Sequence, residues 1–161
     1  MKRLVLLVLV LTFLAAGCGV GQGGGKDKAA SLDFAATTAT GKSFEGSSLS
    51  GKPTVFWFWA PWCPTCRAQI PEVSGLARQH AGAVNFVGVG SLDGADKIAG
   101  FADLVPGNDI TELTDPEGTV WKHFGVTAQS TYLVLDARGE QVAKGSLSRD
   151  KLAKLVEGLA H

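Results

Sequence analysis

The sequence of 161 residues has no excess of charge of either sign, because 15 lysines and arginines balance 15 aspartates and glutamates. Nothing in this balance suggests binding to nucleic acid phosphates or an electrostatic hold on anionic lipid. Its longest apolar run, Leu4 to Leu14, is also too short to span a bilayer as a mature helix. We therefore expect no nucleic-acid partner and no permanent transmembrane helix.

Cysteine is scarce as well, with only Cys18, Cys63 and Cys66 in the chain. Three cysteines cannot form the dense disulfide framework of a small secreted scaffold. A zinc site is disfavoured, because His80 is correctly spaced from Cys66 but residues 84–86 supply no second histidine. We expect no metal and no cofactor other than a Cys63–Cys66 disulfide.

The most informative stretch of the sequence is an unbroken apolar run from Val55 to Ala60 that leads directly to Cys63 and Cys66. The run does not alternate between apolar and polar residues, which is typical of a central strand covered on both faces. Pro64 favours a helix start, since proline at the first helical position gives up only an unpaired N–H. The pattern predicts a buried strand that delivers two cysteines to the start of a helix.

The spacing of Cys63 and Cys66 places both thiols within one helical turn, close enough to form a disulfide. Cys63 is the expected exposed member, and unpaired N–H groups at the helix start should lower its pKa. Cys66 should be more buried. A purely structural disulfide remains an alternative, but closing so short a loop contributes little stability through chain entropy. Redox exchange is the favoured interpretation.

Several further segments accompany the cysteine motif, and together they resemble the thioredoxin fold and its extracytoplasmic TlpA/ResA/DsbE (CcmG) thiol-disulfide oxidoreductases. The resemblance is carried by Gly51-Lys52-Pro53, Phe58 to Arg67, Pro71-Glu72, Asp115 to Gly118, Phe124 to Thr127 and Tyr132 to Gly139. It implies one α/β domain over residues 32–161, with a mixed sheet flanked by helices, an N-terminal β-hairpin and an inserted helix and strand between Asp96 and Thr114. The Cys-Pro-Thr-Cys motif is similar to that of the DsbE (CcmG) cytochrome-maturation proteins and to that of secreted actinobacterial DsbE-like proteins.

The alternation of strand and helix signals along the chain also argues for an α/β fold. The expected strands are Leu32 to Thr38, Gly41 to Phe44, Thr54 to Ala60, Val84 to Val89, Ile110 to Thr114, Thr131 to Asp136 and Gln141 to Gly145. The expected helices are Pro64 to Ala81, Asp96 to Leu104, a turn from Gly118 to Phe124, and a final helix after Ser148 that ends at Leu159.

The resemblance implies that Cys63 attacks or is attacked and that Cys66 resolves the mixed disulfide. It places the substrate against Trp62, Pro64, Thr65, Gln129, Ser130 and Thr131. Two departures stand out: Trp57 and Gln69 occupy positions where related reductases carry an acidic residue, and Ser130 occupies the usual cis-proline position. Because a cis bond before serine costs about 3 to 4 kcal/mol, we expect a trans Gln129–Ser130 peptide with Ser130 beside Cys63.

The N-terminal pattern, in which Lys2 and Arg3 precede the apolar run Leu4 to Leu14, is typical of an export signal. Leu14-Ala15-Ala16-Gly17-Cys18 is similar to a bacterial lipobox, so we expect a signal peptide over residues 1–17, a lipid on Cys18, and a glycine-rich tether over 18–31. The expected location is the outer face of the cell membrane. An ordinary signal peptide and a soluble secreted protein form the alternative.

The predicted function is oxidation of thiols in exported proteins by a monomer that has a membrane redox partner. The first alternative is reduction of apocytochrome c during cytochrome maturation. A peroxidase of the same superfamily would want a proline and a threonine where Phe56 and Ala60 stand. A metal-handling relative such as a copper chaperone would have a wider cysteine spacing and a histidine near Ser130.

Overall fold

The computed structural model describes residues 30–161, which form one seven-stranded sheet in the order β2-β1-β5-β4-β3-β6-β7. The strands are β1 (Ala35–Thr38), β2 (Ser43–Glu45), β3 (Thr54–Trp59), β4 (Asn85–Gly90), β5 (Ile110–Thr114), β6 (Thr131–Leu135) and β7 (Gln141–Gly145). The helices are η1 (Gly46–Leu49), α1 (Pro64–Gln79), α2 (Ala95–Ala102), α3 (Thr119–His123) and α4 (Arg149–Leu159). The mixed α/β sheet with flanking helices, the N-terminal hairpin and the inserted helix and strand are confirmed.

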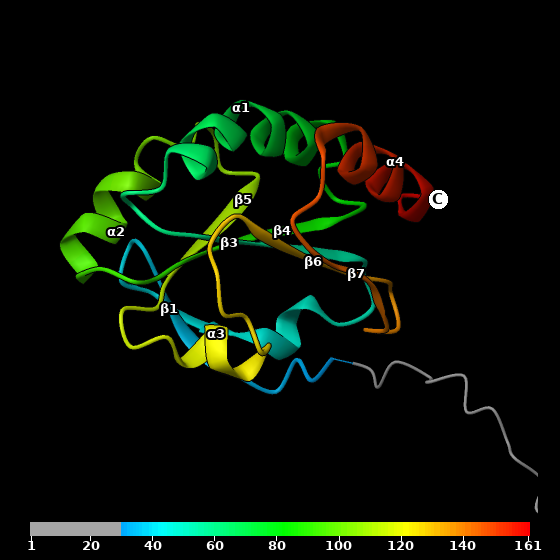
Figure 1. Ribbon diagram of the computed structural model, residues 1–161. Helices are drawn as coiled ribbons and strands as arrows, with labels where there is room; N and C mark the ends of the chain where they lie inside the picture. Colours follow the sequence, from blue (N-terminus) through cyan, green and yellow to red (C-terminus); the bar gives the residue numbers. More distant parts are fainter. Residues whose placement is uncertain (1–29) are drawn as a thin grey trace, which may run out of the picture.

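The central strand β3 pairs in parallel with β4 and antiparallel with β6, and all six of its residues are buried. Its aromatic side chains alternate between two cores. Trp57 and Trp59 pack on the face covered by α1, α2 and α4, whereas Phe56 and Phe58 pack on the face covered by α3 (Figure 1). The continuous apolar run therefore reflects burial on both faces, as the sequence predicts.

Local signals set the helix ends within a few residues of those expected. Helix α1 begins at Pro64 after Cys63 as N-cap and continues through Pro71 to Gln79, two residues short of the predicted end. Helix α4 follows Ser148, whose Oγ accepts a hydrogen bond from the Lys151 N–H at 3.4 Å. The first strand starts at Ala35 and not at Leu32.

Helix η1 is absent from the sequence-based expectation, because its short segment contains no apolar period. Its first residue, Gly46, lies against the Phe34 ring, and a Cβ at Gly46 would overlap that ring. The Gly46 N–H donates to the Phe34 carbonyl at 2.8 Å. This close approach requires glycine, so the turn after β2 is set by tertiary packing.

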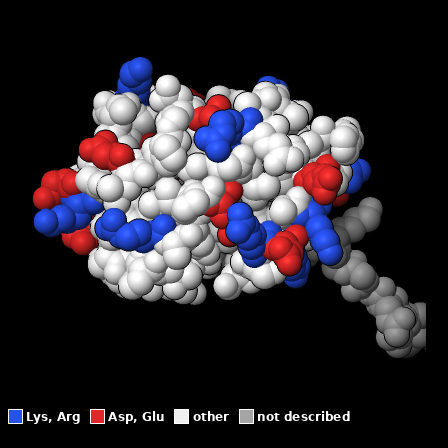
Figure 2. Space-filling model, turned by 90° about the horizontal axis from the view of Figure 1, so that it is seen from above, with Lys and Arg blue, Asp and Glu red and all other residues white. Residues whose placement is uncertain are grey.

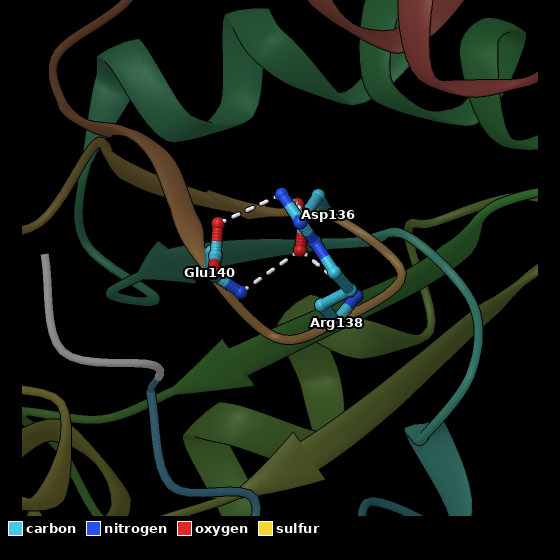
Figure 3. A network of polar contacts seen from close by, with 3 residues as sticks. All are labelled: Asp136, Arg138 and Glu140. Atoms are coloured by element: carbon cyan, nitrogen blue, oxygen red, sulfur yellow. Dashed lines mark hydrogen bonds and ion pairs between the residues drawn. The ribbon is translucent and has the colours of Figure 1, made fainter. Parts of the chain in front are cut away.

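The β6–β7 turn is held by a network of Asp136, Arg138 and Glu140 (Figure 3). The Asp136 carboxylate accepts from the backbone N–H groups of Glu140 at 2.9 Å and Arg138 at 2.8 Å, and these bonds hold the pKa of Asp136 below its ordinary value. The Ala30 N–H donates to the Gly139 carbonyl at 2.9 Å. The start of the described chain therefore docks on this turn.

Charged residues of both signs are interspersed on the helical face of the molecule (Figure 2). No helix within residues 30–161 is long and apolar enough to cross a membrane. The predicted signal peptide, Cys18 and most of the tether lie outside the described residues.

Candidate active site

The two cysteines lie between the carboxyl end of β3 and the first turn of α1, where they form a disulfide with a Cα–Cα distance of 5.3 Å. Cys63 has extended backbone angles as the N-cap, and its Sγ accepts a hydrogen bond from the Cys66 N–H at 3.0 Å. This N–H belongs to the first helical turn and has no intrahelical acceptor. The geometry supplies a donor that can stabilise negative charge on Cys63 after reduction.

Cys63 and Cys66 differ less in solvent exposure than the sequence predicts. Cys66 is fully buried, as expected, but Cys63 is only 4% exposed. Both belong to the core cluster that includes Trp57 and Trp59. The expectation of a well-exposed Cys63 is therefore wrong for the disulfide form, although the order of accessibility agrees.

Ser130 lies against the disulfide from the loop that precedes β6. Its Oγ is 3.5 Å from the Cys63 Sγ and 3.3 Å from the Cys66 Sγ. No cis peptide occurs within residues 30–161, so the Gln129–Ser130 bond is trans, as expected. Ser130 has a φ of 61°, a left-handed conformation that costs a non-glycine residue roughly 1–2 kcal/mol. The backbone strain presents the hydroxyl to both sulfurs.

The surface beside Cys63 is apolar and accessible. Trp62 is 54% exposed, and its indole N–H donates to the Leu92 carbonyl at 3.2 Å. Leu92 is 48% exposed and, like Ser130, has a positive φ, of 63°. Two strained non-glycine residues thus flank the motif. Such outliers often mark a functional site.

The remaining sequence-predicted contact residues are distributed around the same end of the sheet. Pro64 and Thr65 are exposed on the first turn of α1, and Gln129 and Thr131 are half-buried on either side of Ser130. All four leave part of their surface available to a bound molecule.

Trp57 and Gln69, which occupy the positions of the acidic residues in related reductases, are hydrogen-bonded to each other. The Trp57 indole N–H donates to Gln69 Oε1 at 2.9 Å. Gln69 lies on α1, three residues after Cys66, so the bond ties the central strand to the active-site helix. Neither side chain titrates near neutral pH, and this pair cannot accept a proton from the cysteines.

One functional candidate escaped the sequence reading, namely Glu112 on β5. Its Oε2 accepts a hydrogen bond from the Trp59 indole N–H at 3.0 Å, while Oε1 is buried without a partner among the described residues. Burial raises the pKa of Glu112 to about 8, although the Trp59 bond opposes the shift. Gly88 is its register partner on β4, and a Cβ there would overlap the carboxylate. The sequence does show an acidic residue inside the expected strand Ile110 to Thr114. Only the strand register shows that Gly88 leaves room for the Glu112 side chain.

Residues 30–161 contain no cluster of three or more histidine, cysteine or acidic side chains that could hold a metal ion. The site instead offers a disulfide, an N–H donor and a hydroxyl on its sulfurs, and an apolar rim. These features suit thiol-disulfide exchange, in which a thiolate attacks one disulfide sulfur and displaces the other.

Comparison with known proteins agrees with this chemistry. The Redoxin family profile matches residues 26–157. The chain is 36% identical over 132 residues to the soluble secreted antigen MPT53 of Mycobacterium tuberculosis, covering 80% of this chain and 75% of that protein. It is 23% identical over 165 residues to the sporulation thiol-disulfide oxidoreductase A of Bacillus subtilis, covering 97% of each.

Two solved structures resemble this chain in both fold and sequence. MTB DsbF, in mixed oxidised and reduced forms, superposes with a TM-score of 0.73 at 43% identity, covering 80% of this chain and 96% of that one. A secreted Mycobacterium tuberculosis disulfide oxidoreductase homologous to E. coli DsbE gives a TM-score of 0.72 at 35% identity, covering 80% and 97%. The chain therefore belongs to the Redoxin family and is a thiol-disulfide oxidoreductase with a thioredoxin fold.

Proposed function

We propose that this protein is a lipid-anchored donor of disulfide bonds to exported proteins. The observation that carries the proposal is the pair of donors on Cys63 Sγ, the Cys66 N–H at 3.0 Å and the Ser130 hydroxyl at 3.5 Å. Both stabilise a Cys63 thiolate more than a Cys63 disulfide sulfur. A stabilised thiolate is a better leaving group, which makes the disulfide a stronger oxidant.

In the proposed reaction, a substrate thiolate attacks Cys63 Sγ and the electron pair of the Cys63–Cys66 bond passes to Cys66. A second substrate thiolate then attacks the substrate sulfur of the mixed disulfide, and Cys63 leaves as a thiolate. The substrate gains a disulfide, and the enzyme gains two electrons. A membrane redox partner accepts those electrons and regenerates the Cys63–Cys66 disulfide.

Substrate contact is assigned to the surface around Cys63. Trp62 offers an exposed aromatic face, and Pro64 and Thr65 flank it on the first turn of α1. The loop of Gln129, Ser130 and Thr131 faces the disulfide from the other side. A polypeptide segment that presents its cysteine to Cys63 would lie between these two elements.

Thiol trapping in intact cells tests the direction of electron flow. A disulfide donor stands mainly oxidised at steady state, so Cys63 and Cys66 should resist alkylation until a reductant is added. A reductant of apocytochrome c would instead be trapped mainly as the dithiol. The resemblance of the cysteine motif to that of DsbE (CcmG) cytochrome-maturation proteins makes that outcome the alternative, and a reduced pair would overturn the oxidant proposal.

Lipid attachment is supported by the lipobox-like sequence that ends at Cys18. A signal peptide removed by cleavage cannot retain the chain, so membrane retention requires the lipid. Mass spectrometry of the mature N-terminus should find a lipidated Cys18, and Cys18→Ser should yield uncleaved precursor or a soluble form. A mature N-terminus elsewhere without lipid would support the soluble secreted alternative, which the name of the MPT53 relative fits.

A further inference from the structure

Glu112 lies on the same face of the sheet as the active-site disulfide. Register pairing aligns it with Gly88 on β4 and Trp57 on β3, so the three residues form one row across neighbouring strands. Trp57 and both cysteines share one core cluster on that face. The carboxyl group therefore lies on the face of the sheet that α1, α2 and α4 cover, and its Oε1 is buried there.

A continuous set of contacts joins Glu112 to the residue next to Cys66. Its Oε2 is bonded to Trp59, and the Trp59 ring stacks on Phe101 with centroids 4.3 Å apart. The Arg67 guanidinium lies over the Phe101 ring, 5.8 Å from its centroid. Arg67 follows Cys66 directly in α1. The carboxyl and the disulfide thus sit in one low-dielectric layer.

No charged side chain neutralises Glu112 within residues 30–161. The residue lines a cavity of about 560 Å³ whose other charged members are Lys42, from the β1–β2 turn, and Asp103, at the end of α2. Neither forms an ion pair with it. Its protonation is governed by burial and by the Trp59 bond.

We propose that Glu112 takes up a proton when the Cys63–Cys66 disulfide is reduced and releases it when the disulfide re-forms. The oxidised pair carries no charge, whereas the reduced pair carries a thiolate on Cys63. Two negative charges in the same layer disfavour each other, so the thiolate makes the Glu112 carboxylate bind its proton more tightly. Glu112 acts through this coupling and does not contact the reacting sulfurs.

The proton balance of the reaction is complete with this assignment. Above about pH 8, where the carboxyl is ionised in the oxidised protein, a substrate dithiol meets an enzyme disulfide with an ionised Glu112. The products are a substrate disulfide, a Cys63 thiolate, a Cys66 thiol and a neutral Glu112. Of the two protons lost by the substrate thiols, one resides on Cys66 and the other on Glu112. The inference rests on thiol-disulfide exchange itself and not on its direction, so it survives if the oxidant proposal fails.

The midpoint potential of the cysteine pair, measured against pH in redox buffers, tests the coupling. One extra proton taken up per two electrons changes the equilibrium constant tenfold per pH unit, so the wild-type slope should steepen by up to about 30 mV per unit above about pH 8. Glu112→Gln retains an acceptor for Trp59 and cannot titrate, so the steep region should vanish. Proton uptake on reduction, measured in weakly buffered solution, should fall correspondingly.

Glu157→Gln is the matched control, because it removes the same charge from an exposed position on α4 and should leave the wild-type slope. Trp59→Phe retains Glu112 but removes the hydrogen bond that lowers its pKa, so the steep region should move to higher pH. Should Glu112→Gln not fold, this second variant still decides. The inference would be overturned if the midpoint potentials of wild type and Glu112→Gln had the same slope against pH. It would also be overturned if the steep region of Trp59→Phe lay at the same pH as that of wild type.

Discussion

Removal of the Ser130 hydroxyl should make the disulfide a weaker oxidant. The hydroxyl lies 3.5 Å from the Cys63 Sγ and can donate to the thiolate that forms on reduction. A hydrogen bond to a charged group contributes about 1.5–3 kcal/mol, and 1.4 kcal/mol corresponds to about 30 mV for a two-electron couple. Ser130→Ala should therefore lower the reduction potential by roughly 30–60 mV.

The same change should raise the pKa of the Cys63 thiol, because the thiolate loses a donor while the thiol does not. Ultraviolet absorbance of the thiolate against pH measures this shift, and equilibration with glutathione followed by mass spectrometry measures the potential. Ser130→Pro also removes the hydroxyl, so its potential should fall in the same direction, but proline cannot adopt a φ of 61° and the loop must rearrange around it.

Ser130→Gly separates loss of the hydroxyl from relief of backbone strain. Glycine adopts the observed φ of 61° without penalty, whereas alanine retains the cost. If the hydroxyl sets the potential, Ser130→Gly and Ser130→Ala should shift it equally. The free energy of unfolding of Ser130→Gly should then exceed that of Ser130→Ala by about 1 kcal/mol. Unchanged potentials in both variants would refute the role of the hydroxyl.

Two further outcomes are expected. In the reduced protein, an alkylating reagent near neutral pH should label Cys63 before Cys66, since Cys63 is the N-cap with a bound N–H and Cys66 is fully buried; faster labelling of Cys66 would reverse the roles. Glu112→Gln should also change the pH dependence of folding. The folded state retains the Glu112 proton up to about pH 8 and the unfolded state only up to about 4.5, so wild-type stability falls by about 1.4 kcal/mol per pH unit between them. Denaturant unfolding of the Gln variant should lack this decline, and identical pH profiles would contradict the burial of the carboxyl.

Local sequence signals predicted most of the elements. The strand Thr54–Trp59 and the helix after it followed from an apolar run, a proline and a pair of cysteines, each of which acts over a few residues. The burial of Trp57 and Trp59 followed from their places within the apolar run, whereas the exposure of Trp62 is shown only by the structure.

Features that depend on register or tertiary contact could not be predicted in this way. Glu112 faces Gly88 only because β5 and β4 pair in one particular register, and sequence spacing carries no such information. The place of Ser130 beside Cys63 followed from the family resemblance, but its left-handed backbone did not. The turn at Gly46 is fixed by the Phe34 ring, which comes from another segment.

The contact of Ala30 with Gly139 sets the point at which the preceding segment meets the domain. Gly139 lies in the turn after β6, at the end of the sheet where the antiparallel strand β3 begins, and Cys63 lies beyond the end of β3. Six residues of strand separate these two poles by roughly 20 Å. A lipid on Cys18 would therefore attach the domain at the end of the sheet away from the disulfide. This arrangement favours access of soluble proteins to the disulfide, whereas exchange with a partner embedded in the bilayer would require the domain to turn.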